Sequence, residues 1–504
     1  MAKVLFICAG CEHLGIEYIS SMLKKHNHQV DLFLVPILPE DSFFNVKLVQ
    51  KNYKYSDFKK KIIERIQNHP PDIIAFSAVT DFYRYGCDIA KDIKAQIDIP
   101  IIFGGIHPTT VPDIVINEPF IDIICVGEGE FAMLELMNRI EEYKKEKTLQ
   151  INNLWFKKNG VVTKNPTSDL VEDLDEFPLP DKQLFYDRMP SFRRQFNINS
   201  TRGCPFGCTY CCNNILRAIY KEKGKYLRKR SVENVLLELE QNVTKDTKLI
   251  FFRDEVFPYN KVWMREFAEK YPKRIGIPYK LFIHPRMCTQ ETTQLLAQSG
   301  CIYVSMGVQS GFEETRKKYL KRIDTNDEIA AAVKNLKKAG IRVNIDHIAG
   351  VPGEGENEMV QTAIFYNDFR PNVVTYFWMT LYPNTEIVSI YKSLSLITDK
   401  EIGRINHGEL QSDFLGGSVS FNQQLFYQFR TFLCYLPLIP KWFFSLLIKW
   451  KVYKYVNIKS RFFSSLFPRL LLAPFNRDVR AWKVEIGDWL ERMSYFKKFM
   501  RDEV

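Results

Sequence analysis

Three cysteines near the middle of the chain constrain its fold and chemistry more than any other feature. Cys204, Cys208 and Cys211 lie in the segment Thr201-Arg-Gly-Cys-Pro-Phe-Gly-Cys-Thr-Tyr-Cys211, with the spacing C-x3-C-x2-C. Three thiolates on one short loop that carries glycine and proline can hold three irons of a [4Fe–4S] cluster. The fourth iron then lacks a protein ligand and can bind a small molecule. The spacing therefore predicts a redox-active cluster with one open iron.

Two other uses of these cysteines fit the sequence less well. A structural zinc site usually needs four ligands in two paired clusters, and no second C-x2-C or H-x3-5-H pair lies at the required distance. A disulfide framework is typical of small secreted domains, whereas this chain has 504 residues. Cys212 directly follows the third cysteine and is expected to be a bystander, because the side chains of adjacent residues diverge.

Length and composition indicate a large folded protein. A chain of 504 residues has room for about three domains, and 46% hydrophobic residues allow a large packed core. The 11 cysteines are scattered apart from the cluster loop, and the amino terminus opens directly into a strand-like run. Both features predict a protein of the reducing cytoplasm. The net charge of +11 is concentrated after Lys441, where basic residues alternate with Trp, Phe and Leu, which favours a membrane surface over nucleic acid.

The first 147 residues alternate between apolar strand-like runs and helical patterns. Strands are expected at Lys3–Ala9, Gln29–Val35, Asp72–Val79, Pro100–Gly104 and Ile121–Val126, and helices at Leu14–Lys25, Arg84–Gln96 and Glu130–Lys145. This order predicts a parallel, doubly wound, Rossmann-like α/β sheet. Such sheets bind ligands at the carboxyl ends of their strands. Small and glycine-rich segments follow those ends at Cys8–Gly15, Ser77–Thr80, Gly104–Pro108 and Val126–Glu130.

Residues 148–195 are expected to form a connector, with a hairpin at Asn153–Val162 and a proline-containing strap after it. Residues 196–400 then resume the alternation of strands and helices. Strands are expected at Lys248–Phe252, Tyr279–Ile283, Tyr303–Val308, Arg342–Ile348 and Val373–Met379, with helices at Thr289–Gln298 and Asn326–Ala339. The pattern predicts a partial (β/α)6 TIM-like barrel, whose chemistry lies at the carboxyl ends of its strands.

Residues 401–504 are expected to form a helical carboxyl-terminal domain. Thr431–Trp450 is apolar, but Pro437, Pro440 and Lys441 interrupt it, so we predict no membrane-spanning helix, which needs about 20 apolar residues. Two interpretations stay open for this region. It is either a helical cap packed on the barrel or an interfacial surface that helps the protein to reach a lipid-like substrate.

Taken in order, these motifs resemble those of the cobalamin (B12)-binding radical S-adenosylmethionine (SAM) enzymes, the class B methyltransferases in particular. The cysteine loop is similar to the loop whose open iron binds the methionine part of SAM. Gly104-Gly-Ile-His-Pro108 and Val126-Gly-Glu-Gly-Glu130 resemble the cobalamin-binding domain. The resemblance implies a B12-binding domain over residues 1–147 and a radical SAM barrel over residues 196–400.

The resemblance also implies a set of residues for each cofactor. The cluster ligands are Cys204, Cys208 and Cys211. The expected SAM contacts are Phe206, Tyr210, Asp254, Glu255, Gln309, Ser310, Gly350 and Pro352. The expected cobalamin contacts are Ser77, Thr80, Gly104, Gly105, His107, Gly127, Glu128 and Gly129. Two departures matter: Gln309 stands where a glutamate is usual, and the D-x-H-x-x-G motif of a histidine cobalt ligand is absent, so the lower face of cobalamin is expected to lack histidine.

The implied function is reductive cleavage of SAM at the cluster, with methylation of an unactivated carbon in an apolar or amphipathic substrate. Cyclisation, ring rearrangement and oxygen insertion with the same cofactors are alternatives, as are a non-catalytic corrin or cluster sensor and a tRNA-modifying methylthiolase. A methylthiolase would need further cluster cysteines, but Cys8, Cys11, Cys87 and Cys125 lie in or beside strand-like and helical runs.

The expected partners are a small-molecule or lipid-like substrate and a reductant such as flavodoxin or ferredoxin, without nucleic acid. The expected location is the cytoplasm, with peripheral membrane contact through the carboxyl-terminal region as a variant. No catalytic residue beyond the cluster ligands is predicted.

Overall fold

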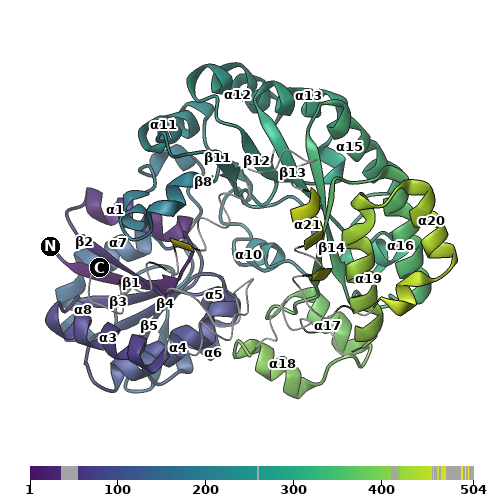
Figure 1. The fold of residues 1–504 in the computed structure, drawn as a ribbon. Helices are drawn as coiled ribbons and strands as arrows, with labels where there is room; N and C mark the ends of the chain where they lie inside the picture. The colour runs from purple at the N-terminus through teal and green to yellow at the C-terminus, as the bar shows by residue number, and fades with distance from the viewer. Residues whose placement is uncertain are drawn as a thin grey trace.

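The protein is built around two β-sheets, one mixed and one parallel, that face each other across a central helix. The computed structural model describes residues 1–35, 55–257, 260–409 and 421–456, together with residues 418, 458, 463–464, 467–472, 490–491, 494 and 498. Figure 1 shows the first sheet at the lower left, the second sheet as an arc over the top and right, and α10 (Asn213–Ile219) between them.

The first sheet has seven strands in the order β2-β1-β3-β4-β5-β6-β7. Its strands are β1 Lys3–Ala9, β2 Gln29–Val35, β3 Ile73–Ser77, β4 Ile101–Gly104, β5 Ile123–Cys125, β6 Leu154–Lys158 and β7 Val161–Lys164. The first five are parallel, and β6 and β7 add an antiparallel edge. The predicted hairpin is confirmed, with Asn159 and Gly160 both at positive φ, but it extends this sheet rather than standing apart in a connector.

Helices cover both faces of this sheet, as a doubly wound fold requires. The helices are α1 Leu14–Lys25, α3 Tyr55–Asn68, α4 Thr80–Lys94, α5 Ile106–Thr110, α6 Pro112–Asn117, α7 Glu130–Asn138 and α8 Ile140–Glu146. Alternate side chains of β1 enter two separate cores: Phe6 packs with α1, α7 and α8, whereas Ile7 packs with α3, α4 and α6. The helix expected at Glu130–Lys145 is interrupted at Arg139, which has non-helical backbone angles.

The second sheet has six parallel strands in chain order, β8-β11-β12-β13-β14-β15. These are β8 Gln195–Ile198, β11 Leu249–Phe252, β12 Tyr279–Ile283, β13 Cys301–Gln309, β14 Arg342–Ala349 and β15 Val373–Trp378. The outer helices are α11 Val232–Asn242, α12 Lys261–Arg274, α13 Gln290–Gln298, α15 Asn326–Lys338 and α16 Glu356–Phe369. Because β8 and β15 are the two edges of this sheet, the barrel is open, and the predicted partial (β/α)6 fold is confirmed.

Two helices of the carboxyl-terminal region pack against the barrel. They are α19 Gln423–Tyr435 and α20 Lys441–Lys449, and a shorter helix, α21, covers Phe467–Leu472. Helix α19 lies against β15 and α16. Much of the predicted 401–504 domain falls outside the described residues. Within those residues, no helix combines the length and the apolar character that crossing a bilayer requires.

A buried lysine in the strap joins the two halves of the molecule. Lys182 is 1% exposed, and its Nζ lies 3.0 Å from Glu12 Oε1 and 2.7 Å from Glu17 Oε2, both in the first domain. The same ammonium donates a 2.6 Å hydrogen bond to the backbone oxygen of Asn197 in β8. A buried charge must be paired to be tolerated, so this contact fixes the loop after β1 against the first barrel strand.

Candidate active site between the two domains

The cysteine loop runs from the short strand β9 (Thr201–Arg202) to α10, and side chains of α10 hold it in place. Asn214 Nδ2 donates to the backbone oxygen of Cys208 at 2.8 Å. Arg217 donates to the backbone oxygens of Cys204 and Phe206. The three loop carbonyls lie outside regular secondary structure and need hydrogen-bond donors. Side chains of α10 supply these donors and so fix the loop.

The three thiol groups of the loop differ in their exposure to solvent. Cys208 is buried, whereas Cys204 and Cys211 are half-buried. Among the described residues, no three Cys, His, Asp or Glu side chains converge closely enough to hold one metal ion. A [4Fe–4S] cluster would bind each thiolate through a different iron. The loop presents three thiols, which are the donors that such a cluster would need.

A buried arginine that the sequence analysis missed lies beside the loop. Arg322 Nη1 donates to Cys208 Sγ at 3.8 Å, and Nη2 donates to the backbone oxygen of Gly307 at 2.5 Å. The guanidinium also interacts with Tyr210, one of the predicted SAM contacts. A positive charge thus lies next to the Cys208 sulfur, where it would stabilise a thiolate.

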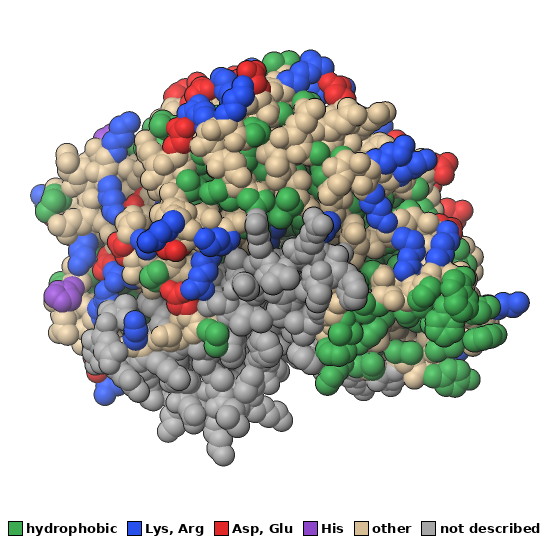
Figure 2. Space-filling view, turned by 45° about the horizontal axis from the view of Figure 1, so that its top comes forward, with side chains coloured by type: hydrophobic (Ala, Val, Ile, Leu, Met, Phe, Trp, Pro, Cys, Tyr) green, Lys and Arg blue, Asp and Glu red, His purple; other side chains and the backbone are tan. Residues whose placement is uncertain are grey.

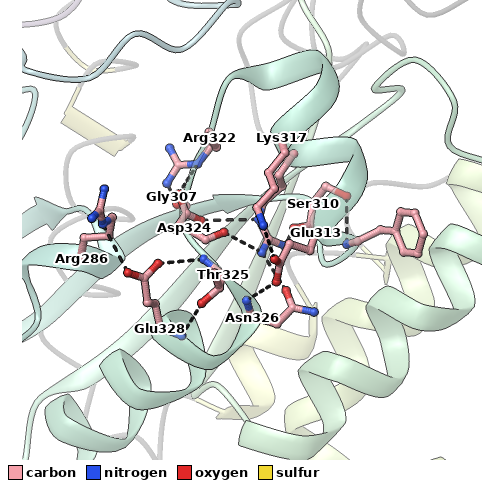
Figure 3. A network of polar contacts seen from close by, with 12 residues as sticks. Arg286, Gly307, Ser310, Glu313, Lys317, Arg322, Asp324, Thr325, Asn326 and Glu328 are labelled. Atoms are coloured by element: carbon pink, nitrogen blue, oxygen red, sulfur yellow. Dashed lines mark hydrogen bonds and ion pairs between the residues drawn. The ribbon is translucent and has the colours of Figure 1, made fainter.

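Asp324 connects this arginine to the other side of the loop. It is fully buried, and its carboxylate lies 3.4 Å from Arg322 Nε, 3.5 Å from Arg316 Nε and 3.4 Å from His284 Nε2. Figure 3 shows Arg322 and Asp324 within the polar network of this region. Burial opposes ionisation, but the nearby His284 and the charges of both arginines hold the pKa of Asp324 below its usual range. His284 in turn stacks on Phe206, with ring centroids 3.7 Å apart.

The end of β13 offers an unsatisfied amide. Gln309 has a φ of 71°, and the register of β13 against β14 shifts at this point. Its Oε1 is buried and has no hydrogen-bond partner among the described residues. Leaving such an atom unpaired costs about 1–3 kcal/mol, and strain of this kind is common at ligand sites. Gln309 therefore fits a ligand that donates a hydrogen bond, as the ribose hydroxyls or the ammonium of SAM would.

Of the other predicted SAM contacts, Ser310 already makes a hydrogen bond within the protein. Ser310 Oγ donates to Glu354 Oε1 at 2.7 Å, which ties the end of β13 to the segment that contains Gly350 and Pro352. Burial raises the pKa of Glu354 to about 8 against the opposing hydrogen bonds. Both Ser310 and Glu354 are therefore engaged within the protein, and Gly350 contributes backbone at a φ of 89°.

Asp254 and Glu255 are adjacent but have separate environments. Asp254 is fully buried and accepts hydrogen bonds from the backbone nitrogens and hydroxyls of Ser200 and Thr201. Its carboxylate thus anchors the start of the cysteine loop, and burial raises its pKa to about 7. Glu255 instead lines a cavity between the two domains. Burial raises the pKa of the Glu255 carboxyl.

This interdomain cavity has a volume of about 350 Å³ and contains most of the predicted cobalamin contacts. Ser77, Gly104, Gly105, Gly127, Glu128 and Gly129 line it from the strand ends of the first sheet. Asn199, Arg202, Tyr220, Tyr226, Arg228 and Glu255 line it from the barrel side. No histidine is among its lining residues in the described part of the chain.

The walls of the cavity combine glycine backbone with apolar side chains. Gly105 and Gly127 both have positive φ, and a Cβ at Gly127 would lie 2.0 Å from the Tyr220 hydroxyl. Phe6, Ala75 and Ile102 give the cavity an apolar floor within the sheet. Its volume of about 350 Å³ would hold part of a cobalamin rather than the whole cofactor. These residues therefore fit the group that the resemblance implies.

Thr80 and His107 do not line the cavity. The His107 ring stacks on Tyr83 with a centroid distance of 4.0 Å, and its Nδ1 lies 3.2 Å from Thr80 Oγ1. Burial lowers the pKa of His107 to about 3, so the ring is neutral. In this structure both residues support the loop after β4 from within the core.

Glu128 faces two arginines of the barrel domain. Arg202 Nη1 lies 3.3 Å from its carboxylate, and Arg228 Nη1 donates to it at 3.1 Å. Arg202 also pairs with Glu130 at 2.6 Å. Although burial opposes ionisation, the two arginines lower the pKa of Glu128. These contacts join the Val126–Glu130 segment to β9 and β10 (Arg228–Lys229), the strands that flank the cysteine loop.

Comparisons with known proteins agree with this arrangement. The chain matches the radical SAM superfamily over residues 198–365 and the B12 binding domain over residues 9–137. It is 27% identical over 385 residues to an uncharacterized methyltransferase of Pyrococcus horikoshii, across 74% of this chain and 77% of the relative. It is 26% identical over 340 residues to the anaerobic magnesium-protoporphyrin IX monomethyl ester cyclase of Rubrivivax gelatinosus, across 65% of this chain and 60% of the cyclase.

The fold is also found in a solved structure. The cobalamin-dependent S-adenosylmethionine radical enzyme OxsB, with aqua-cobalamin and S-adenosylmethionine bound, matches with a TM-score of 0.67 at 18% identity. The match covers 99% of this chain and 80% of OxsB. At this identity the likeness concerns the fold alone.

Proposed function

We propose that this chain, which belongs to the cobalamin-dependent radical SAM enzymes, methylates an unactivated carbon of an apolar or amphipathic substrate. The observation that carries the proposal is the interdomain cavity, which brings the glycine edge of the first sheet and Glu255 of the barrel together. When bound, the cluster and SAM supply a radical that removes a hydrogen atom, and cobalamin supplies the methyl group. The residues of the chain would bind and position these groups.

On the barrel side, the residues position groups around the cysteine loop. Cys204, Cys208 and Cys211 would hold the cluster, and Arg322 stabilises negative charge on Cys208. The unpaired Oε1 of Gln309 would accept a hydrogen bond from SAM. The Phe206 ring, fixed by its stack on His284, would present an apolar surface to the adenine.

On the first-domain side, Gly104, Gly105, Gly127 and Gly129 would let the backbone approach cobalamin closely. No histidine of the described residues lines this cavity, so none of them would offer an imidazole nitrogen to the cofactor there. The ion pairs of Glu128 and Glu130 with Arg202 and Arg228 hold the two domains together and help to exclude water from the space between them.

A second candidate function keeps both cofactors but transfers no methyl group. The similarity to a cyclase favours it, because the 26% identity extends over 340 residues, or 65% of this chain. For either function we propose a small-molecule or lipid-like substrate, a flavodoxin or ferredoxin as reductant, no nucleic acid, and a cytoplasmic location.

The proposal is tested with protein purified without oxygen from cells supplied with cobalamin. Incubation with a strong reductant, SAM and an apolar cell extract should yield S-adenosylhomocysteine together with 5′-deoxyadenosine. 5′-Deoxyadenosine without S-adenosylhomocysteine would favour the cyclase-like alternative. Neither product from protein that contains both iron and cobalt would overturn both functions.

The cobalamin site has its own variant and control. Gly127→Val should lose most of the bound cobalt and keep its iron, because the new side chain would collide with Tyr220. Gly160→Val is the matched control, since Gly160 also has positive φ but has open space around it. Cobalt retained in Gly127→Val would refute the placement of cobalamin in this cavity.

A further inference from the structure

Helix α20 and the turn after it expose large aromatic side chains to solvent. Trp442 is 68% exposed, Trp450 60% and Tyr455 86%, and Phe443 beside Trp442 is 38% exposed. Figure 2 shows a gathering of hydrophobic side chains at the lower right, on the side of the molecule where Figure 1 shows α19 and α20. Exposed aromatic residues that cluster in this way usually mark an interaction surface.

Packing within the protein does not explain these side chains, because the opposite side of the same segment already makes its core contacts. Phe444 is fully buried and stacks on Phe432 of α19, with ring centroids 4.4 Å apart. Tyr453 is 1% exposed and lies 4.7 Å from the Phe429 ring. The helix is therefore anchored through one side, whereas the aromatic rings on its other side are exposed and pack against none of the core residues described here.

The charge of this region is one-sided. Residues 414–477 contain nine Lys or Arg and no Asp or Glu. Within the exposed segment, Lys449, Lys451 and Lys454 lie next to Trp450 and Tyr455. The neighbouring helix α16 supplies two acids, Asp368 at 3.1 Å from Lys441 and Glu356 at 2.8 Å from Lys454. A positive excess remains after these pairs are formed.

We propose that Trp442, Phe443, Trp450 and Tyr455, with Lys449, Lys451 and Lys454, form a face that docks the enzyme on an anionic lipid bilayer. Trp and Tyr favour the level of the lipid headgroups, and lysines beside them attract anionic lipids. With nine residues, α20 is far too short to span a bilayer, so it lies along the surface. The inference is independent of the proposed reaction.

The test is co-sedimentation of the full-length holoprotein with vesicles. Binding to phosphatidylcholine vesicles that contain phosphatidylglycerol should exceed binding to pure phosphatidylcholine vesicles roughly tenfold at low salt, and it should weaken as salt rises. Absence of binding to the anionic vesicles would overturn the proposal. Equal binding to both compositions would overturn the electrostatic part of it.

Variants distinguish binding through this face from nonspecific hydrophobic binding to vesicles. Trp442→Ser, Trp450→Ser and Tyr455→Ser combined should abolish vesicle binding, whereas Val161→Ser with Val262→Ser, at exposed apolar positions elsewhere, should leave it unchanged. Cobalt content, iron content and Tm equal to wild type show that each variant is folded. Wild-type binding by the triple aromatic variant would refute the proposal.

A second pair of variants tests the charges. Lys449→Glu, Lys451→Glu and Lys454→Glu combined should reduce binding to anionic vesicles at least roughly tenfold. Lys25→Glu, Lys145→Glu and Lys158→Glu change the net charge equally at exposed sites on the first domain. Equal loss in both triple variants would attribute binding to net charge alone.

If the face instead joins two copies of the chain, sedimentation without lipid would show an oligomer that the aromatic variant lacks, and this would also overturn the proposal.

Discussion

The Tyr220 hydroxyl lies 2.6 Å from the backbone nitrogen of Glu128 and accepts its hydrogen bond. Tyr220 directly follows α10, the helix that holds the cysteine loop, while Glu128 belongs to the glycine-rich segment after β5. One contact thus links the two predicted cofactor sites across the domain boundary. A displacement of α10 would change both sites together.

Tyr220→Phe should weaken cobalamin binding while iron content stays near wild type. The change leaves the N–H of Glu128 without an acceptor, which costs about 1–3 kcal/mol in a buried setting. Titration of the cluster-containing protein with cobalamin, followed by visible absorption, gives the affinity. Tyr186→Phe is a suitable control, because the buried Tyr186 hydroxyl has no hydrogen-bond partner among the described residues.

Arg322 is expected to set the reduction potential of the cluster. Arg322→Leu removes a positive charge next to Cys208, and so disfavours the more negative, reduced state. At an effective dielectric constant of about 20, a charge at this range is worth on the order of 100 mV. Potentiometric titration followed by electron paramagnetic resonance should show a more negative potential in Arg322→Leu and partial recovery in Arg322→Lys. An unchanged potential in Arg322→Leu would contradict this role.

Much of the fold could be predicted because apolar periodicity is a local property. The strand Tyr279–Ile283 and the helix Leu14–Lys25 have the predicted bounds. The first barrel strand, β8, was missed because it has only four residues, of which Phe196 and Ile198 alone are apolar. Asn197 is tolerated there because its amide donates to Glu12, a partner 185 positions away that no local pattern reveals.

The candidate site could be predicted in part for the same reason. The cysteine spacing and the glycine segments are short motifs, so they are visible in the sequence. Residue type alone could not show that Asp254 anchors the loop or that Glu128 faces two arginines, because a carboxylate suits a ligand and an ion pair equally well. Arg322 and Tyr220 reach the site only through tertiary packing, from segments without any recognisable motif.

Lys182→Met should destabilise the protein by about 3–5 kcal/mol, the usual cost of leaving buried charges unpaired. Glu12 and Glu17 would lose their ammonium partner, and the loop after β1 would lose its link to Asn197. Urea unfolding monitored by circular dichroism measures the change. Lys25→Met, at an exposed position, should change stability by less than about 0.5 kcal/mol. A similar loss of unfolding free energy in the two variants would show that the Lys182 contacts are dispensable for stability.

Glu354 should make the barrel less stable as the pH rises. Burial raises the pKa of its carboxyl from 4.5 to about 8, so the folded protein binds this proton more tightly than the unfolded chain does. The contribution of Glu354 is therefore fully present below about pH 4.5 and is lost as the pH passes through 8, with an upper limit of about 5 kcal/mol. Glu354→Gln keeps a neutral group beside Ser310 and should flatten the decline in unfolding free energy between these pH values. A decline equally steep in wild type and Glu354→Gln would mean that another group is responsible, and Asp254, with a pKa raised to about 7, would be the next to replace.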